Sequence, residues 1–300
     1  MIAVTGATGT IGRELVRRLL DEGQAVAAVT RNPEASGLPY GARVVWGDPS
    51  RPRTLASALS GVTALFLHPR AAGDAASELV AIARAQGAAR VVALSAMNVD
   101  EPTENQPSRY RGDRNREAEL AAVHSGLEWV SLRASSFASN AIGMWGAQIR
   151  AGDVVRYVYA AFEEALIDER DVAEVAAGAL LADSGSGLLR RRLELTGAQS
   201  LSHEAMVGII GTAVGRPLRY EELAPEVVAR GMVQHGMPEP FVTALMARYA
   251  RELGTPARVT GAVEEVLGRP PRTFAQWAAD NAAAFRARSS EHPEPLTVAR

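Results

Sequence analysis

Three glycines near the start of the chain are spaced so that they could hold a diphosphate. They are Gly6, Gly9 and Gly12, between a short β-type run at 2–5 and an apolar pattern with helical spacing at 11–20. In such a turn the first glycine allows the tight bend, the second lets the backbone approach the ligand, and the third lets the helix pack closely on the strand. Free N–H groups at the helix start bind phosphates, so the sequence predicts a dinucleotide site. The intervening residues that we also expect to contact the dinucleotide are Thr8, Thr10 and Ile11.

The residue that ends the predicted second strand decides between the two pyridine dinucleotides. Sites for NAD(H) usually place an acidic residue there, which binds the ribose 2′-hydroxyl, whereas an arginine accommodates the 2′-phosphate of NADP(H). Here the strand at 25–30 is followed by Arg31, and the first acidic residue is Glu34. A guanidinium is permanently charged and matches phosphate in shape. The sequence therefore favours NADP(H) over NAD(H), with Arg31 as a solvated turn charge being the alternative.

One histidine lies where a proton donor could act. His68 directly follows the predicted strand at 62–67, and an imidazole titrates near neutral pH. The alternative is a loop histidine anchored by Pro69. The other histidines are scattered without i, i+4 pairing, so no metal site is predicted. They are His124, His203, His235 and His292.

Strand and helix patterns alternate along the first half of the chain. After the second strand, the β-type runs are 43–46, 62–67, 90–95 and 127–132, and the helical patterns between them are 53–60, 75–85 and 114–124. This rhythm predicts an α/β fold with a doubly wound, Rossmann-like parallel sheet. Residues 137–167 are predicted to be irregular, whereas 171–181 is predicted helical and 192–195 a strand that returns to the sheet.

The patterns divide the chain into two lobes. We expect an NADP(H)-binding Rossmann domain at 1–152, completed by return segments near 165–197. Residues 198–287 are predicted to form a smaller, mostly helical cap lobe that holds a substrate or a partner. Residues 288–300, which contain two prolines, are predicted to be a flexible tail.

The composition excludes several classes of partner and chemistry. With 47% apolar residues and a net charge of −2, nothing favours binding to nucleic acid or to a membrane. The chain has no cysteine, and all 32 basic residues are arginine, so thiolate and lysine chemistry are excluded. No signal-peptide pattern opens the sequence, and a cytoplasmic location is expected. A monomer and a homodimer both remain open.

The chain resembles the NmrA-like proteins among the atypical short-chain dehydrogenases/reductases. The most specific match is the opening run Thr5–Gly12. The resemblance covers about residues 1–285, and it depends on the order and spacing of further short matches. They are Thr30–Pro33, Gly47-Asp48, Leu94-Ser95, Glu119, Ser125–Leu127, Leu132-Arg133, Phe137, Asn140, Asp168, Asp171–Ala173 and Leu195–Gly197.

The resemblance implies a path for NADP(H) along the carboxyl edge of the sheet. Asp48 would contact the adenine, although a turn acid ahead of Pro49 is the alternative. Further along the cofactor, from ribose to carboxamide, the implied contacts are Leu67, His68, Ser95, Ala96, Ser135, Ser136 and Phe137. A substrate pocket is expected beside the nicotinamide, lined by Met97, Asn98, Phe137, Trp145 and Tyr157. For the aromatic residues, packing between the lobes is the alternative.

The best-known members of the superfamily use a Tyr-x-x-x-Lys pair, which this chain lacks because it has no lysine. Alignment with the family places Arg111 and Asn115 at the two positions. One register away, Tyr110 and Arg114 reproduce the spacing with arginine in place of lysine, which makes Tyr110 a candidate acid. A surface tyrosine in an arginine-rich segment is the favoured alternative.

Three functions are compatible with this pattern. The first is an NADPH-dependent oxidoreductase that transfers hydride to a flat hydrophobic acceptor, such as a quinone or conjugated carbonyl. Such an acceptor delocalises charge and can take its proton from water, so the protein needs mainly to align the reactants. The alternative is a non-catalytic NADP(H)-binding redox sensor that regulates a protein partner, and a weaker third option is isomerisation or ring chemistry on the same fold.

Overall fold

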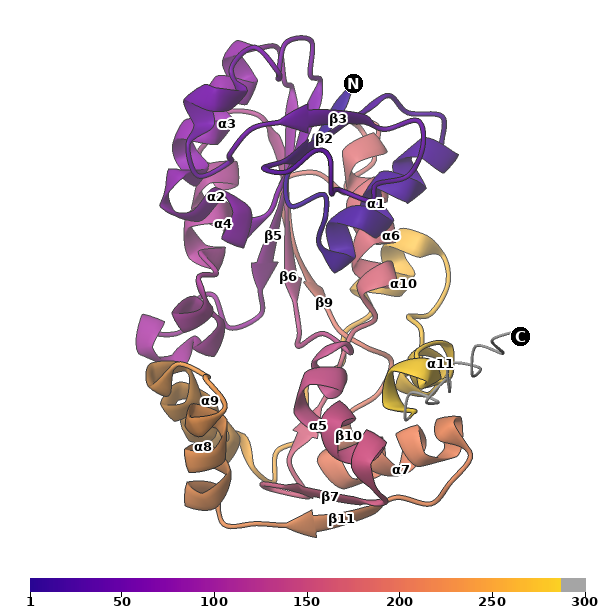
Figure 1. Ribbon diagram of the computed structural model, residues 1–300. Helices are drawn as coiled ribbons and strands as arrows, with labels where there is room; N and C mark the ends of the chain where they lie inside the picture. The colour runs from indigo at the N-terminus through magenta and orange to yellow at the C-terminus, as the bar shows by residue number, and fades with distance from the viewer. Residues whose placement is uncertain (287–300) are drawn as a thin grey trace, which may run out of the picture.

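A seven-stranded parallel sheet forms the upper lobe of the computed structural model, which describes residues 1–286 (Figure 1). Its strands are β1 (Ile2–Val4), β2 (Val26–Thr30), β3 (Arg43–Trp46), β4 (Ala64–Leu67), β5 (Arg90–Ala96), β6 (Glu128–Ala134) and β9 (Arg191–Leu195). The strand order is β3-β2-β1-β4-β5-β6-β9, so the chain adds strands first on one side of β1 and then, from β4 on, on the other side. At this change of order Val4 of β1 pairs with Ala28 on one side and with Phe66 on the other. In parallel sheets, ligands bind at the carboxyl edge at such a change of order. The predicted doubly wound fold is confirmed.

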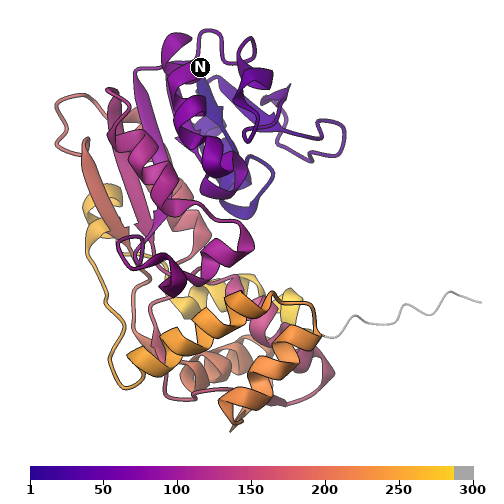
Figure 2. The same ribbon diagram turned by 90° about the vertical axis from the view of Figure 1, so that its left-hand side faces the viewer.

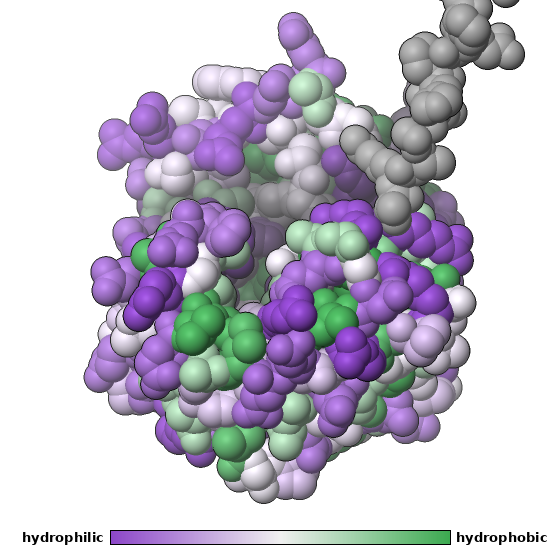
Figure 3. All heavy atoms as spheres, turned by 60° about the horizontal axis from the view of Figure 1, so that its bottom comes forward, coloured by the Kyte–Doolittle hydropathy of each residue, from purple (hydrophilic) through white to green (hydrophobic). Residues whose placement is uncertain are grey.

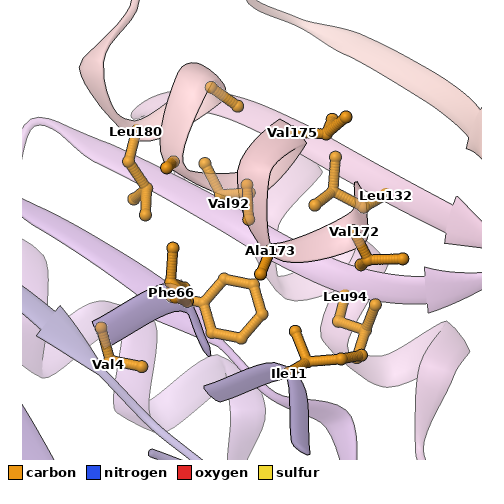
Figure 4. Close-up of a cluster of buried hydrophobic side chains, with 14 of the residues drawn as sticks. Val4, Ile11, Phe66, Val92, Leu94, Leu132, Val172, Ala173, Val175 and Leu180 are labelled. Atoms are coloured by element: carbon orange, nitrogen blue, oxygen red, sulfur yellow. The ribbon is translucent and has the colours of Figure 1, made fainter. Parts of the chain in front are cut away.

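Helices cover both faces of this sheet (Figures 1 and 2). On one face lie α1 (Thr10–Asp21), α6 (Glu169–Leu181) and α10 (Ala262–Leu267), and on the other α2 (Pro69–Ala72), α3 (Ala76–Ala85) and α4 (Asn115–Val123). Figure 4 shows the core on the first face, where the ring of Phe66 lies between Val4, Ile11 and Ala173. The sheet core therefore holds the start of α1 against the ends of β1 and β4.

The second lobe has its own core. It contains α5 (Asn140–Ala151), β7 (Val154–Tyr157), β8 (Glu163–Glu164), β10 (Leu201–Ser202), α7 (His203–Val214), β11 (Arg219–Glu222), α8 (Pro225–Gln234), α9 (Glu239–Glu252) and α11 (Phe274–Asp280). Trp145, Phe162 and Tyr249 are fully buried at its centre. Within residues 1–286, no helix is both long and apolar enough to cross a bilayer.

Two predicted segments differ from the structure. The irregular stretch expected at 137–167 is wrong, because it contains α5 and the strands β7 and β8. Two glycines lower the helix propensity of α5, so the sequence did not indicate a helix there. The signal for it was the helical spacing of Ala141, Trp145 and Ile149, which are buried. The helix expected at 53–60 is also wrong, since only a short 3-10 turn forms at Pro52–Leu55.

The chain passes between the lobes more often than the predicted boundaries imply. α5 lies within the predicted 1–152 domain, yet its buried face packs in the second lobe. α10 lies within the predicted 198–287 lobe, yet Val263 packs against α6 on the sheet. In both cases the apolar face of a helix determines the lobe to which it belongs. The predicted tail 288–300 lies outside the described residues.

A buried carboxylate joins α4 to two strands of the sheet. Glu119 accepts hydrogen bonds from Ser131 (2.6 Å), Arg133 (2.6 and 3.0 Å) and Arg192 (2.8 Å). Although burial opposes ionisation, these bonds lower the pKa of Glu119 to about 2. The ion pair is stabilising only while the carboxylate is charged. Replacing Glu119 would leave the buried guanidinium of Arg133 with Asp100 as its remaining acidic partner.

We expect Glu119→Gln to lower the free energy of unfolding by about 2–4 kcal/mol at pH 7, measured by urea denaturation. The folded-state pKa lies below the ordinary value of 4.5, so the stability it supplies is present above 4.5 and lost as the pH falls toward about 2. The difference in the free energy of unfolding between wild type and variant should therefore become smaller as the pH falls from 4.5 toward 2. The matched control is Glu14→Gln, which removes an exposed pair with Arg17 and should cost less than about 0.5 kcal/mol. A gap of the same size at pH 7 and pH 3 would contradict the charge-based account.

Candidate cofactor and active site

The glycine turn leaves bare backbone at the start of α1. Gly6 has a φ of +65°, and the N–H of Gly9 donates to its carbonyl oxygen (3.0 Å). A Cβ on Gly12 would collide with that carbonyl, and a Cβ on Gly6 would lie 2.8 Å from the ring of His68. No side chain caps the N-terminus of α1, and its first turn carries no acidic residue. The N–H groups at this end are therefore available for an anion.

The end of β4 is tied to the end of β1 through a threonine. The Oγ1 of Thr5 donates to the carbonyl of Phe66 (2.9 Å) and accepts the N–H of His68 (2.8 Å). This holds the His68 ring against Gly6. Its Nδ1 is buried and has no hydrogen-bond partner within residues 1–286. Burial, reinforced by Arg70 and opposed by Asp113, lowers the pKa of His68 to about 4.

These features fit a bound pyridine dinucleotide. The uncapped helix start and the glycine cradle suit the diphosphate, and a buried imidazole nitrogen without a partner is costly unless a ligand supplies one. Of the other residues predicted at this turn, Thr8 and Thr10 are exposed, whereas the side chain of Ile11 is buried in the core. Ile11 can therefore contribute only its backbone.

Arg31 and Asp48 lie beyond the turn, at the ends of β2 and β3. The side chain of Arg31 is exposed, as a phosphate contact requires. Asp48 accepts hydrogen bonds from the N–H (3.0 Å) and the hydroxyl (2.7 Å) of Ser50, which is the turn-acid alternative. Burial opposes the shift, but these bonds and the charges of Arg31 and Arg51 lower the pKa of Asp48. The contact of Asp48 with adenine stays a prediction.

The residues predicted beside the nicotinamide gather at the carboxyl ends of β4, β5 and β6. Leu67 is buried in the sheet core, and Ser95 is 3% exposed, with its hydroxyl 3.5 Å from the carbonyl of Asn115. The hydroxyl of Ser135 donates to the carbonyl of Ala165 (2.7 Å) and is therefore occupied. The half-buried residues at this edge are Ala96, Met97, Asn98, Ser136 and Phe137. Their contacts with cofactor or substrate remain predictions.

Trp145 and Tyr157 lie away from that edge, in the core of the second lobe. Trp145 is fully buried and Tyr157 is 5% exposed, with their ring centroids 6.4 Å apart. Both rings also pack edge-on against His203. The expectation that these two rings line the substrate pocket is therefore corrected: their apolar surface is used for packing, which was the alternative.

The Tyr110–Arg114 spacing does not produce an activated tyrosine. Tyr110 lies in a 3-10 turn (Pro107–Arg111) and is 38% exposed. The guanidinium of Arg114 pairs with Asp74 (2.8 Å) and donates to the carbonyl of Arg109 (3.2 Å). Asn115, at the family's lysine position, is buried and donates to the hydroxyl of Ser108 (3.2 Å). The surface alternative for Tyr110 is the one that this geometry supports.

The sequence did not point to two polar contacts near His68. Thr5 was visible only as part of the glycine motif, and its bridging role depends on the pairing of β1 with β4. Arg70 and Asp113 form a two-pronged ion pair (2.9 and 2.7 Å) between residues far apart in the chain, which no local spacing could reveal. Within residues 1–286, no group of side chains is suited to hold a metal ion.

The fold is shared with solved structures of nucleotide-dependent enzymes. The NADPH-dependent quinone oxidoreductase of Escherichia coli, complexed with NADPH, superimposes with a TM-score of 0.77 at 21% identity, covering 93% of this chain and 99% of that one. The triphenylmethane reductase of Citrobacter sp., complexed with NADP(H), gives 0.77 at 20% identity, covering 94% and 100%. At these identities the likeness concerns the fold.

Two curated relatives are more similar in sequence. A (4-alkanoyl-5-oxo-2,5-dihydrofuran-3-yl)methyl phosphate reductase of Streptomyces griseus is 37% identical, over 95% of this chain and 99% of that protein. An NAD(P)H azoreductase of Xenophilus azovorans is 32% identical, over 96% and 100%. The expectation of an enzyme is confirmed, and so is the expectation of a pyridine dinucleotide as its cofactor. The preference for NADP(H) over NAD(H) stays a prediction.

We expect Arg31→Ala to weaken NADPH by about 1.5–3 kcal/mol, because a charge-assisted contact with the 2′-phosphate is lost. Binding of NADH, which lacks that phosphate, should change little. Calorimetry with both nucleotides measures the difference. The control is Arg53→Ala, which removes the same charge from a side chain that is 92% exposed and paired with Glu78. Equal weakening of NADPH and NADH by Arg31→Ala would refute the assignment.

A family model agrees with the geometry of the turn and with both relatives. It is described as NAD(P)H-binding and matches residues 6–183, which include the glycine turn, Arg31, His68 and the edge residues of β4 to β6. The resemblance to atypical short-chain dehydrogenases/reductases is thereby confirmed. The chain belongs to this NAD(P)H-binding family and is an NAD(P)H-dependent oxidoreductase of the atypical short-chain type.

Proposed function

We propose that the protein uses NADPH to reduce flat, hydrophobic acceptors whose reducible bond is part of a conjugated system. Conjugated carbonyl compounds and quinones are the acceptors that fit best. When bound, NADPH supplies a hydride. The acceptor must also gain a proton, and the chemistry of that proton limits the class of acceptor.

The observation that carries the proposal is that neither candidate proton donor, His68 or Tyr110, is set up to act as an acid. His68, with a pKa of about 4, is neutral at pH 7 and holds no readily released proton. Tyr110 lies at the surface, and Arg114, the cation at the fourth residue on, is paired with Asp74 (2.8 Å). A saturated ketone would leave a localised alkoxide, which needs a nearby acid. A conjugated acceptor spreads the charge and can be protonated by water.

The names of the relatives support the same class. A 2,5-dihydrofuran with a 5-oxo and a 4-alkanoyl group contains a C=C bond conjugated with two carbonyl groups. Hydride addition at its far carbon would place the charge on both oxygens as an enolate. An azo group likewise has its N=N bond within a conjugated system. These acceptors share planarity and delocalisation, although their reducible atoms differ.

The chain's own residues would bind and orient such an acceptor. Met97 and Phe137 are half-buried at neighbouring strand ends and offer apolar contact, while Asn98 offers an amide to an acceptor oxygen. Figure 3 shows a face that is hollowed, with hydrophobic residues beside the hollow, which suits an apolar ligand. Alignment of bound reactants can supply a large part of the rate without an acid.

The test is NADPH oxidation with a matched panel of acceptors. We expect turnover with a 2-acyl butenolide and with a simple quinone, and kcat/KM at least about a hundredfold lower with the saturated 2-acyl lactone. The saturated compound keeps the size and polarity of the butenolide, so it isolates conjugation. Equal rates for the pair would contradict the proposal. NADPH binding without turnover on any acceptor would favour the redox-sensor alternative.

Replacing Tyr110 by Phe should leave kcat/KM for the best conjugated acceptor within about twofold, because its hydroxyl has no role as the acid. Steady-state kinetics at pH 7 measure this. Arg114→Gln serves as the companion variant, since it removes the guanidinium at the fourth residue on. A loss near a hundredfold in Tyr110→Phe would instead identify the tyrosine as the proton donor.

A further inference from the structure

One arginine of α1 joins two loops that both face the predicted nucleotide. Arg13 directly follows Gly12 in the first turn of the helix. Its Nη2 donates to the carbonyls of Thr8 (3.3 Å) and Ser36 (3.1 Å), and its Nη1 donates to the carbonyl of Gly37. Thr8 belongs to the glycine turn, whereas Ser36 and Gly37 belong to the loop that follows Arg31. The guanidinium therefore links the diphosphate turn to the loop beside the ribose.

The charge of Arg13 has no carboxylate to balance it. Within residues 1–286, no acidic oxygen lies within 4.0 Å of its guanidinium, and its three contacts are all to neutral carbonyls. The other arginines on the exposed side of α1 differ, since Arg17 pairs with Glu14 and Asp21, and Arg18 pairs with Glu22. The Nε–H and one Nη1–H of Arg13 have no partner among the described residues, so donors are left for a ligand.

The backbone around Arg13 allows this close approach. Gly37 has a φ of +55°, a conformation that favours glycine, and a Cβ there would lie 3.4 Å from Nη1. Ser36 is buried, so the loop has a fixed contact with the rest of the domain. The carbonyls of this loop and the guanidinium therefore hold one another in place.

Arg31 provides a second cation at the carboxyl edge of the sheet. It directly follows β2, which pairs with β1 so that the carboxyl ends of the two strands lie together. Within the described residues Arg31 has no ion pair either. Two guanidinium groups without an ion pair, one in the first turn of α1 and one directly after β2, favour an anionic ligand, although the charge of Arg31 also acts on Asp48. A ribose 2′-hydroxyl alone would not require them.

We propose that Arg13 binds the 2′-phosphate of NADP(H) together with Arg31, and that it fixes the loop 32–37 around that phosphate. Arg13 is then a determinant of nucleotide specificity as well as a link between two loops. The inference concerns the cofactor and does not depend on the identity of the acceptor. If the wild type binds NADPH but reduces no acceptor, the proposed function fails and this inference is unaffected.

The experiment measures two fragments that differ only in the phosphate. Calorimetry with 2′,5′-ADP and with 5′-AMP is carried out on the full chain and on Arg13→Gln, which removes the charge but keeps a polar amide. We expect the dissociation constant of 2′,5′-ADP to rise at least about tenfold, because a charge-assisted contact is lost, while that of 5′-AMP changes less than about twofold. The same contrast should appear between NADPH and NADH.

The matched control is Arg17→Gln, one helical turn further along α1, which should leave both fragments unchanged. Equal weakening of 2′,5′-ADP and 5′-AMP by Arg13→Gln would mean that Arg13 only holds the loop, and no effect on either would mean that it has no role; both results overturn the proposal. Should the glutamine variant not fold, Arg13→Lys decides. Lysine keeps the charge but loses the planar fork, so we expect Arg13→Lys to weaken the binding of 2′,5′-ADP about threefold or more and to leave that of 5′-AMP unchanged. An unchanged ratio of the two dissociation constants would overturn the proposal.

Discussion

The contact between the start of α1 and the end of β1 has no side chain in it. Gly6 and Gly12 meet backbone to backbone there, and a Cβ added to Gly12 would force them apart, whereas a Cβ added to Gly6 would collide with the ring of His68. This closeness leaves N–H groups of the helix start uncovered at the carboxyl edge of the sheet, where a polyanion can replace the missing partners. The core packing of Ile11 and Phe66 and the Thr5–His68 hydrogen bond all maintain that arrangement (Figure 4). The predicted positions of the other cofactor contacts follow from it.

The upper lobe was predictable because its signals are local. The glycine turn, the β-type runs and the helices that pack on them each lie within a short stretch of sequence, and the parallel order of the sheet follows from their alternation. The second lobe was less predictable because its core is assembled from segments far apart in the chain. α5 contains Gly143 and Gly146, and its helix is stabilised by the burial of Trp145 against rings from other segments, which no local pattern reports.

The candidate site shows the same division between local and distant contacts. Arg31 and the glycines could be assigned from their places in the first βαβ unit. Whether His68 could act as an acid depended on its burial and on the charges of the nearby Arg70 and of Asp113, which comes from a distant segment. The rings of Trp145 and Tyr157 were equally compatible with a pocket and with a core, because composition does not tell in which direction a side chain faces. A prediction of chemistry that depends on a pKa value therefore requires the folded structure around the group.

The chain enters and leaves the second lobe repeatedly, through α5, through the stretch from β10 to α9, and again through α11. No single cut in the sequence separates the two lobes, as Figure 2 makes visible in the spread of colours through the lower half. Exchange of whole lobes between homologues by recombination at one breakpoint would therefore disrupt both cores. We therefore expect acceptor preference in this architecture to change by point substitutions and loop insertions at the rim of the sheet more readily than by exchange of a lobe.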